Sequence, residues 1–159
     1  MYSFYFSGLT SIIFNENIKT IDEFAFAFCY QLKEVNLVEV KIKTLENGTF
    51  SYSKLEIVYL PKILITMKKR VFENNPLKNI FCYSNNPSDL FDFSLNDATF
   101  KDVDIKECIV HVPRGKINIY KKAKGWGSFN LIIDDSEKFL YKLESKENKL
   151  LNLSKYLNL

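Results

Sequence analysis

Apolar and polar positions alternate over short stretches of this 159-residue chain, and the alternation recurs at a nearly constant interval. Four leucines open the successive units, at intervals of 23, 23 and 22 residues: Leu9, Leu32, Leu55 and Leu77. Each opens a hexad L-x-x-φ-x-φ, where φ is apolar, and the four hexads read LTSIIF, LKEVNL, LEIVYL and LKNIFC. Such alternation predicts a short strand with one buried and one exposed face. Later in the first three units comes a phenylalanine: Phe26, Phe50 and Phe72.

A period of this length with a leucine-led hexad is the signature of leucine-rich repeats. The stretch LEIVYLPKILITMKKRVF resembles the BspA-like class, whose units read L-x-x-I-x-L-P-x-x-V-x-x-I-x-x-x-A-F-x-x-C. Ser53 and Asn75 stand where that pattern has its cysteine, and Cys29 matches it. The resemblance implies an α/β repeat solenoid, a right-handed superhelix with short parallel strands, strand-rich, closed by a C-terminal capping unit.

The repeat register predicts one leucine-rich repeat domain over residues 1–133. Its repeats fall near 9–31, 32–54, 55–76 and 77–107, and a cap follows at 108–133. In the cap sequence CIVHVPRGKINIYKKAKGWGSFNLI, Trp126 and Phe129 are expected to cover the open apolar end. The tail, residues 134–159, predicts a hairpin or the start of another module; the alternative is a helix with Leu143, Leu150 and Leu157 at heptad spacing.

Composition narrows the function classes only slightly. A hydrophobic share of 47% and a charged share of 26% are those of an ordinary globular chain. The net charge of +3 is too small to favour nucleic acid as a partner. No apolar run approaches the roughly 20 residues of a membrane span, and the start MYSFYFSGLTSIIF lacks the pattern of a signal peptide.

Residues that could carry catalysis are sparse. His111 is the only histidine and is expected to be exposed on a strand. The three cysteines, Cys29, Cys82 and Cys108, have no metal spacing and are expected to be buried. Five aspartates lie in a segment without the spacing of an EF-hand: Asp89, Asp92, Asp97, Asp102 and Asp104. We therefore predict no enzyme, no cofactor and no metal site.

The outward positions of the predicted strands supply the one candidate site. In the third and fourth units these positions become apolar and aromatic, and we predict that they contact a protein partner: Ile57, Tyr59, Phe81 and Tyr83. The alternative is that residues 84–107 or the tail fold over this patch. The resemblance implies a binding module of a cell-surface, secreted or adhesion protein. Two alternative functions remain: a structural spacer of a larger repeat protein, and a ligand- or metal-binding domain that uses segment 89–104. The oligomeric state stays open.

Overall fold

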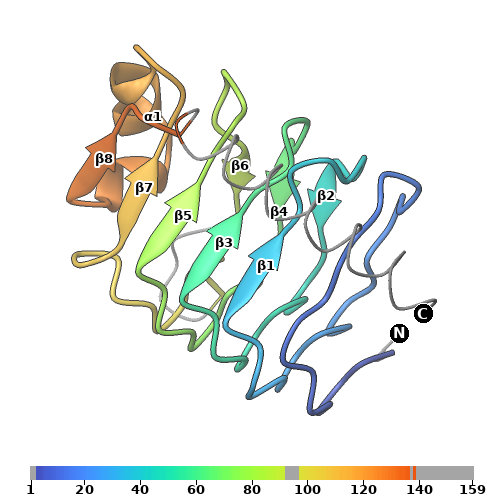
Figure 1. Ribbon diagram of the computed structural model, residues 1–159. Helices are drawn as coiled ribbons and strands as arrows, with labels where there is room; N and C mark the ends of the chain where they lie inside the picture. The colour runs from blue at the N-terminus through green and yellow to red at the C-terminus, as the bar shows by residue number, and fades with distance from the viewer. Residues whose placement is uncertain (1–2, 92–96, 137, 139–159) are drawn as a thin grey trace.

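The computed structural model describes residues 3–91, 97–136 and 138, in which the chain winds through stacked coils (Figure 1). One side of the coils carries a parallel sheet in the order β1-β3-β5-β7-β8. Its strands are β1 (Glu34–Asn36), β3 (Ile57–Tyr59), β5 (Asn79–Phe81), β7 (Ile109–His111) and β8 (Leu131–Ile133). The first repeat, residues 9–31, contributes no strand, so the sheet begins in the second repeat.

The register of this sheet is the one that the leucine-led hexads predict. The central residues of the five strands lie side by side and are all buried: Val35, Val58, Ile80, Val110 and Ile132. Leu37 and Leu60 follow them into the interior, also as predicted. The prediction of buried, parallel, in-register strands is therefore confirmed.

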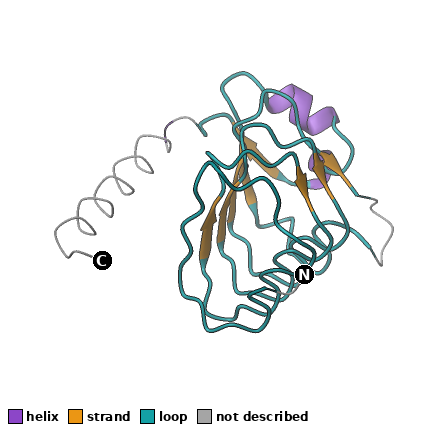
Figure 2. Ribbon diagram, turned by 90° about the vertical axis from the view of Figure 1, so that its right-hand side faces the viewer, coloured by secondary structure: helices purple, strands orange, loops and turns teal. Residues whose placement is uncertain are grey.

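A second sheet, which the sequence pattern did not predict, runs along another side of the coils (Figure 2). Its parallel strands are β2 (Thr44–Leu45), β4 (Thr66–Met67) and β6 (Asp89–Leu90). Leu45 and Met67 point into the core and are fully buried. Two residues are too few to show an alternation of polar and apolar positions, so only the inward residue is visible in the sequence.

The remaining side of each coil is a turn that carries a stack of phenylalanines. The ring centroids of successive members are 5.1, 5.4, 5.8 and 5.5 Å apart along the series Phe4, Phe26, Phe50, Phe72 and Phe100. The backbone N–H groups of Phe26, Phe50 and Phe72 each donate to a carbonyl of the next coil, at 2.9 to 3.0 Å. The ring stack and the backbone ladder together hold the coils in register.

The described chain is strand-rich, and its only α-helix is the six-residue α1 (Ile117–Lys122). The 3-10 helix η1 (Trp126–Ser128) follows, and β8 then returns to the sheet edge. Trp126 is fully buried and meets the Phe100 ring edge-on at 5.9 Å. Whether this unit acts as a cap stays a prediction.

The predicted hairpin, module or helix of the tail falls almost wholly on residues 139–159, outside the described residues. Among the described helices none is long and apolar enough to cross a membrane.

Candidate functional site

The predicted binding residues lie on the outer face of the five-stranded sheet. We use this name for the side chains that flank the buried central row. One outward row holds Glu34, Ile57, Asn79, Ile109 and Leu131, and the other holds Asn36, Tyr59, Phe81, His111 and Ile133. Both rows begin with polar residues on β1 and end with aliphatic ones on β8. The outer face is therefore apolar toward its C-terminal side.

Tyr59, Phe81 and His111 form a continuous stack across β3, β5 and β7. Ring centroids are 4.6 Å apart between Tyr59 and Phe81, and 4.1 Å apart between Phe81 and His111. This geometry is the offset stacking that aromatic rings prefer. The three residues share one register position, so the parallel sheet itself aligns their rings. We call them the outer aromatic column.

The outer aromatic column is buried, contrary to the expectation of an open aromatic patch. Tyr59 is 9% exposed, Phe81 4% and His111 5%. Tyr59 and Phe81 form a small hydrophobic cluster with Val38, and the half-buried Ile57 and Tyr83 pack against it. The four predicted partner-binding residues are thus brought together, but the two at the centre are not open to solvent. The expected exposure of these two was wrong: their rings stack along the column, and Val38, Ile57 and Tyr83 pack around them.

His111 was expected to be an exposed strand histidine, and that expectation was also wrong. Its Nδ1 lies 2.7 Å from Asp135 Oδ1 and its Nε2 lies 2.9 Å from Asn79 Oδ1. Its ring face is covered by Phe81. Asp135 comes two residues after β8, so the chain that leaves the sheet places a carboxylate on the outer face.

The surroundings of Tyr59 disfavour ionisation of its phenol. Burial raises the pKa of the Tyr59 phenol to about 12, and the nearby Glu34 carboxylate acts in the same direction. Both effects disfavour the phenolate, because a buried charge loses water and a second negative charge repels it. The Tyr59 phenol is therefore uncharged at ordinary pH.

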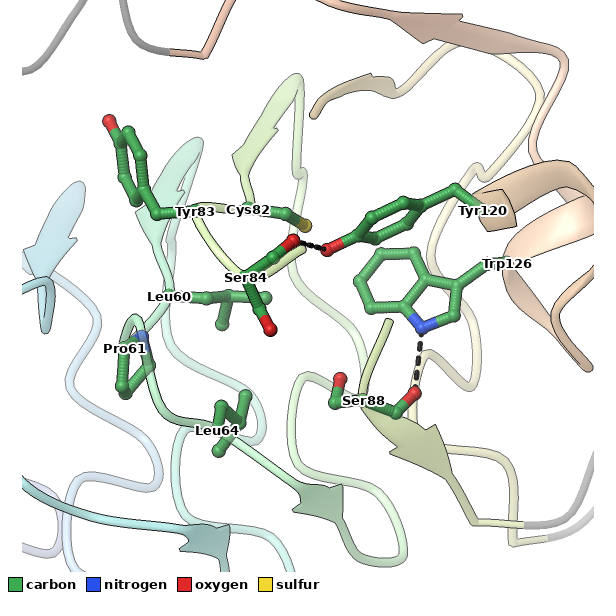
Figure 3. Close-up of a pocket in the computed structure, with 9 residues that line it drawn as sticks. All are labelled: Leu60, Pro61, Leu64, Cys82, Tyr83, Ser84, Ser88, Tyr120 and Trp126. Carbon is green, nitrogen blue, oxygen red and sulfur yellow. Dashed lines mark hydrogen bonds between the residues drawn. The ribbon is translucent and has the colours of Figure 1, made fainter. Parts of the chain in front are cut away.

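Residues 84–107 were one of two candidates for covering this face, and their described part lies elsewhere. The carbonyl of Ser84 accepts from the Tyr120 hydroxyl at 2.9 Å, and that of Ser88 accepts from Trp126 Nε1 at 2.8 Å (Figure 3). Strand β6 then pairs with β4 in the second sheet, and Phe100 enters the phenylalanine stack. The described residues of this segment therefore build the interior and the second sheet.

Figure 3 shows the pocket that these contacts enclose, between coil three and the C-terminal unit. Leu60, Leu64 and Cys82 line it beside Tyr120 and Trp126. Its cavity volume of about 10 Å³ is the space of about one water molecule. Burial raises the pKa of the Cys82 thiol far above its ordinary value, so this group stays protonated and unreactive. The pocket has the character of a packing interface.

The aspartate-rich segment shows charge pairing. Asp97 Oδ2 lies 3.0 Å from Lys69 Nζ, and Asp97 Oδ1 lies 3.3 Å from Arg70 Nε. These bonds hold the pKa of the Asp97 carboxyl below its ordinary value. Within the described residues, no three histidine, cysteine, aspartate or glutamate side chains are grouped as a metal ion would need. Asp92 lies outside the described residues.

The three cysteines are buried as expected and free of disulfides. Burial raises the pKa of the Cys108 thiol to about 12, and Asp104 adds to this effect. The thiolate form, which reacts and binds metals, is therefore suppressed at this position.

An aromatic edge at the N-terminal coils escaped the sequence reasoning. Phe6, Phe28 and Tyr52 occupy one turn position with φ near +60°, followed in the next coils by Asn74 and Asp102. The rings of Phe28 and Tyr52 stack at 4.9 Å, and Phe6 is 65% exposed. Asparagine and aspartate adopt this left-handed conformation readily, whereas phenylalanine rarely does. The signal was present as a two-residue offset from Phe4, Phe26 and Phe50.

Comparison with known proteins agrees with this geometry. No curated protein matches the chain. The family model of the BspA type leucine rich repeat region matches residues 1–120 in six copies. This span includes the coils of the phenylalanine stack, with Phe4 at its start, and the outer aromatic column. Membership of such a repeat family supports a repeat protein-interaction module. The chain belongs to the BspA type leucine-rich repeat family.

Proposed function

We propose that the chain is a protein-binding module and that its partner docks on the outer face of the five-stranded sheet. The observation that carries the proposal is the largely apolar character of both outward rows from β3 to β8, in which Asn79 and His111 are the polar members and lie within hydrogen-bond distance of each other. A strand residue that points away from the core has no packing reason to be apolar, whereas interface centres are enriched in such side chains. Leu131 is 45% exposed and Ile133 is 38% exposed, and half-buried Ile57 and Tyr83 border the aromatic column.

The sheet also suits this use mechanically. Its strands are fixed by the coils behind them, so the outward side chains are presented on a rigid surface. A preorganised surface loses little conformational entropy when it binds. The proposal assigns binding to this face and no catalysis to the chain. By family resemblance we further propose that it serves within a surface or adhesion protein.

The test removes apolar surface from the outer face without touching the core. Leu131→Asp with Ile133→Asp places two charges on that face, at side chains that are 45% and 38% exposed, where they would be buried by a partner. The matched control, Ile63→Asp with Ile65→Asp, places two charges on side chains that are 45% and 53% exposed beside the second sheet. The partner is first identified by cross-linking, and its Kd for each variant is then measured.

We expect the outer-face variant to weaken binding by about 30-fold or more, as for loss of interface hot spots worth about 2 kcal/mol. The control variant should bind like the parent. Equal binding by all three chains would overturn the proposed surface. Equal weakening by both variants would point to a general effect of charge. A structural spacer would show no saturable partner on this face at all.

A further inference from the structure

We infer that two copies of this chain associate through the surface that residues 3–30 form at the start of the stack, which we call the N-terminal end. The starting point is a difference between the two ends of the phenylalanine stack. Phe100, its last ring, is 4% exposed, because Trp126 and Phe129 pack against it. Phe4, its first ring, is 44% exposed. Figure 1 shows the coil of Phe4 at the opposite end of the stack from α1 and β8.

The exposed ring of Phe4 belongs to a larger apolar surface. The other large apolar side chains that are exposed at this end are Tyr5, Phe6, Ile13 and Tyr30. The aromatic members touch one another: Tyr5 lies 5.2 Å from Phe28, and Phe6 meets Tyr30 edge-on at 5.5 Å, both between ring centroids. A connected exposed surface of this kind marks an interaction site, because scattered single side chains are the rule on a monomer.

The start of the stack also lacks charge. Residues 3–14 read SFYFSGLTSIIF and contain no charged residue. Later coils present ion pairs to solvent. Glu56 bridges Lys33 and Lys78 at 3.2 and 2.6 Å, and Lys62 lies 2.6 Å from Glu39. Interface centres are depleted in charged residues and enriched in phenylalanine and tyrosine. The first residues of the stack therefore have the composition of an interface centre.

The backbone of Phe6 gives an independent indication. Its φ of 60° lies in the left-handed region, where later coils have Asn74 and Asp102. Phenylalanine rarely adopts this conformation, which therefore costs free energy. Contacts within the chain cover the ring only in part, since Phe6 remains 65% exposed. An unfavourable backbone conformation that holds an aromatic ring in water is accounted for when a partner covers the ring.

The shape of the N-terminal end suits a second copy of the same surface. Beside the exposed rings lies an open cavity of about 300 Å³, whose lining includes Phe4, Phe14 and Ile18. Ile13 borders it and is 73% exposed. A two-fold axis places the same surface on both sides of an interface. Protruding Ile13 or Phe6 of one copy can thus face the apolar cavity of the other.

Association between unlike ends is less favourable. The C-terminal unit keeps its rings buried and presents the exposed Lys121 and Lys122 of α1. Docking this unit on the N-terminal end would take these charges out of water, which costs free energy. The like-to-like arrangement closes after two copies. None of the strands β1 to β8 takes part, so the inference does not depend on the proposed function.

Sedimentation equilibrium of the full chain, with no partner present, tests the inference. The parent should sediment with twice the mass of one chain and dissociate on dilution. Phe6→Asp with Ile13→Asp should raise the dissociation constant of the dimer by about 100-fold, at about tenfold for each copy. The matched control, Ile63→Asp with Ile65→Asp, adds the same charges at exposed side chains elsewhere and should dimerise like the parent. A monomeric parent, or equal dissociation constants in all three chains, would overturn the inference.

A second variant guards against loss of folding. Phe6→Asn suits the left-handed backbone, as Asn74 does at the same position, and adds no charge. It should keep the near-ultraviolet circular dichroism of a folded chain and weaken the dimer by about tenfold or more. A folded Phe6→Asn chain that dimerises as tightly as the parent would contradict the inference.

Cross-linking identifies the surface that meets Ile13. A benzophenone side chain in place of Ile13, in a mixture of isotopically light and heavy chains, should give cross-links between chains to residues 3–30. Cross-links between chains that reach only residues 114–131 would show association of unlike ends and overturn the inference. A monomer that still binds a partner on the outer face would refute this inference alone, whereas a dimer without such binding would refute the proposed function alone.

Discussion

The hydroxyl of Ser53 donates a hydrogen bond to the carbonyl oxygen of Phe26, 2.7 Å away, one coil toward the N-terminus. The same repeat position makes the equivalent bond elsewhere. Cys29 Sγ donates to the Phe4 carbonyl at 3.2 Å, and Asn75 Nδ2 donates to the Phe50 carbonyl at 2.8 Å. Three different side chains thus satisfy the carbonyl of the stacked phenylalanine. In these three coils the position holds a hydrogen-bond donor, although the residue type differs.

This relationship predicts the effect of removing the donor. Ser53→Ala should lower the free energy of unfolding by about 1–3 kcal/mol, because the buried Phe26 carbonyl loses its side-chain partner. Ser53→Cys should cost less, since a thiol fills the same role at Cys29. Urea denaturation of the three chains measures the difference. A Ser53→Ala chain as stable as the parent would show that the bond contributes nothing net.

The same repeat position shows how much of the fold could be predicted from the sequence. The apolar alternation in LKEVNL and LEIVYL predicted the buried row through Val35 and Val58, because a strand period of two assigns each residue to a face. It also marked Cys29, Ser53 and Asn75 as equivalent. The reason for their equivalence, a shared acceptor one coil away, is a tertiary contact that residue types alone do not reveal.

The candidate site was predicted less completely. Its residues were identified, since Ile57, Tyr59, Phe81 and Tyr83 do gather on one face. Their exposure was not predicted correctly, because the burial of Tyr59 and Phe81 depends on stacking along the column and on the side chains packed around it. His111 joined the column for the same reason. Alternation predicts which face a side chain points to and says nothing of what covers that face.

The phenylalanine stack makes a second prediction. Phe50 is fully buried, between Phe26 at 5.4 Å and Phe72 at 5.8 Å. Phe50→Ala should lower the free energy of unfolding by about 3–5 kcal/mol, as expected for an aromatic ring removed from a core. The matched control is Ile65→Ala, at a side chain that is 53% exposed, where about 0.5 kcal/mol or less is expected. A harmless Phe50→Ala would contradict the importance of the stack.

The C-terminal unit is predicted to close the apolar end. Trp126 and Phe129 both pack against Phe100, the last ring of the stack, at 5.9 and 5.3 Å. A chain ending at Lys106 should therefore aggregate, because removal of this unit exposes the apolar end of the last coil. Size-exclusion chromatography with light scattering measures the outcome. A monomeric fragment 1–106 that unfolds cooperatively would contradict the capping role.

The buried phenol of Tyr59 in the outer aromatic column should make the free energy of unfolding fall as the pH rises above 10. Burial is the chief cause that raises the pKa of Tyr59 from 10.0, the ordinary value of a free phenol, to about 12. The unfolded chain then ionises Tyr59 at lower pH than the folded chain does. The stabilisation is fully present below pH 10 and is lost as the pH rises toward 12. Tyr59→Phe has no phenol at this position, so between these limits it should lose less stability than the parent.

Urea denaturation midpoints measured at intervals from pH 9 to about pH 12 test whether stability falls as the pH rises. The upper limit is the pKa of Tyr59 in the folded chain. The lower limit lies below the ionisation of a free phenol near pH 10. Tyr30→Phe, which removes a phenol that is 46% exposed, is the matched control and should follow the parent. Parallel curves for the parent and Tyr59→Phe would mean that Tyr59 meets water in solution as freely as in the unfolded chain. A smaller loss in Tyr59→Phe alone would locate the buried phenol on the outer face.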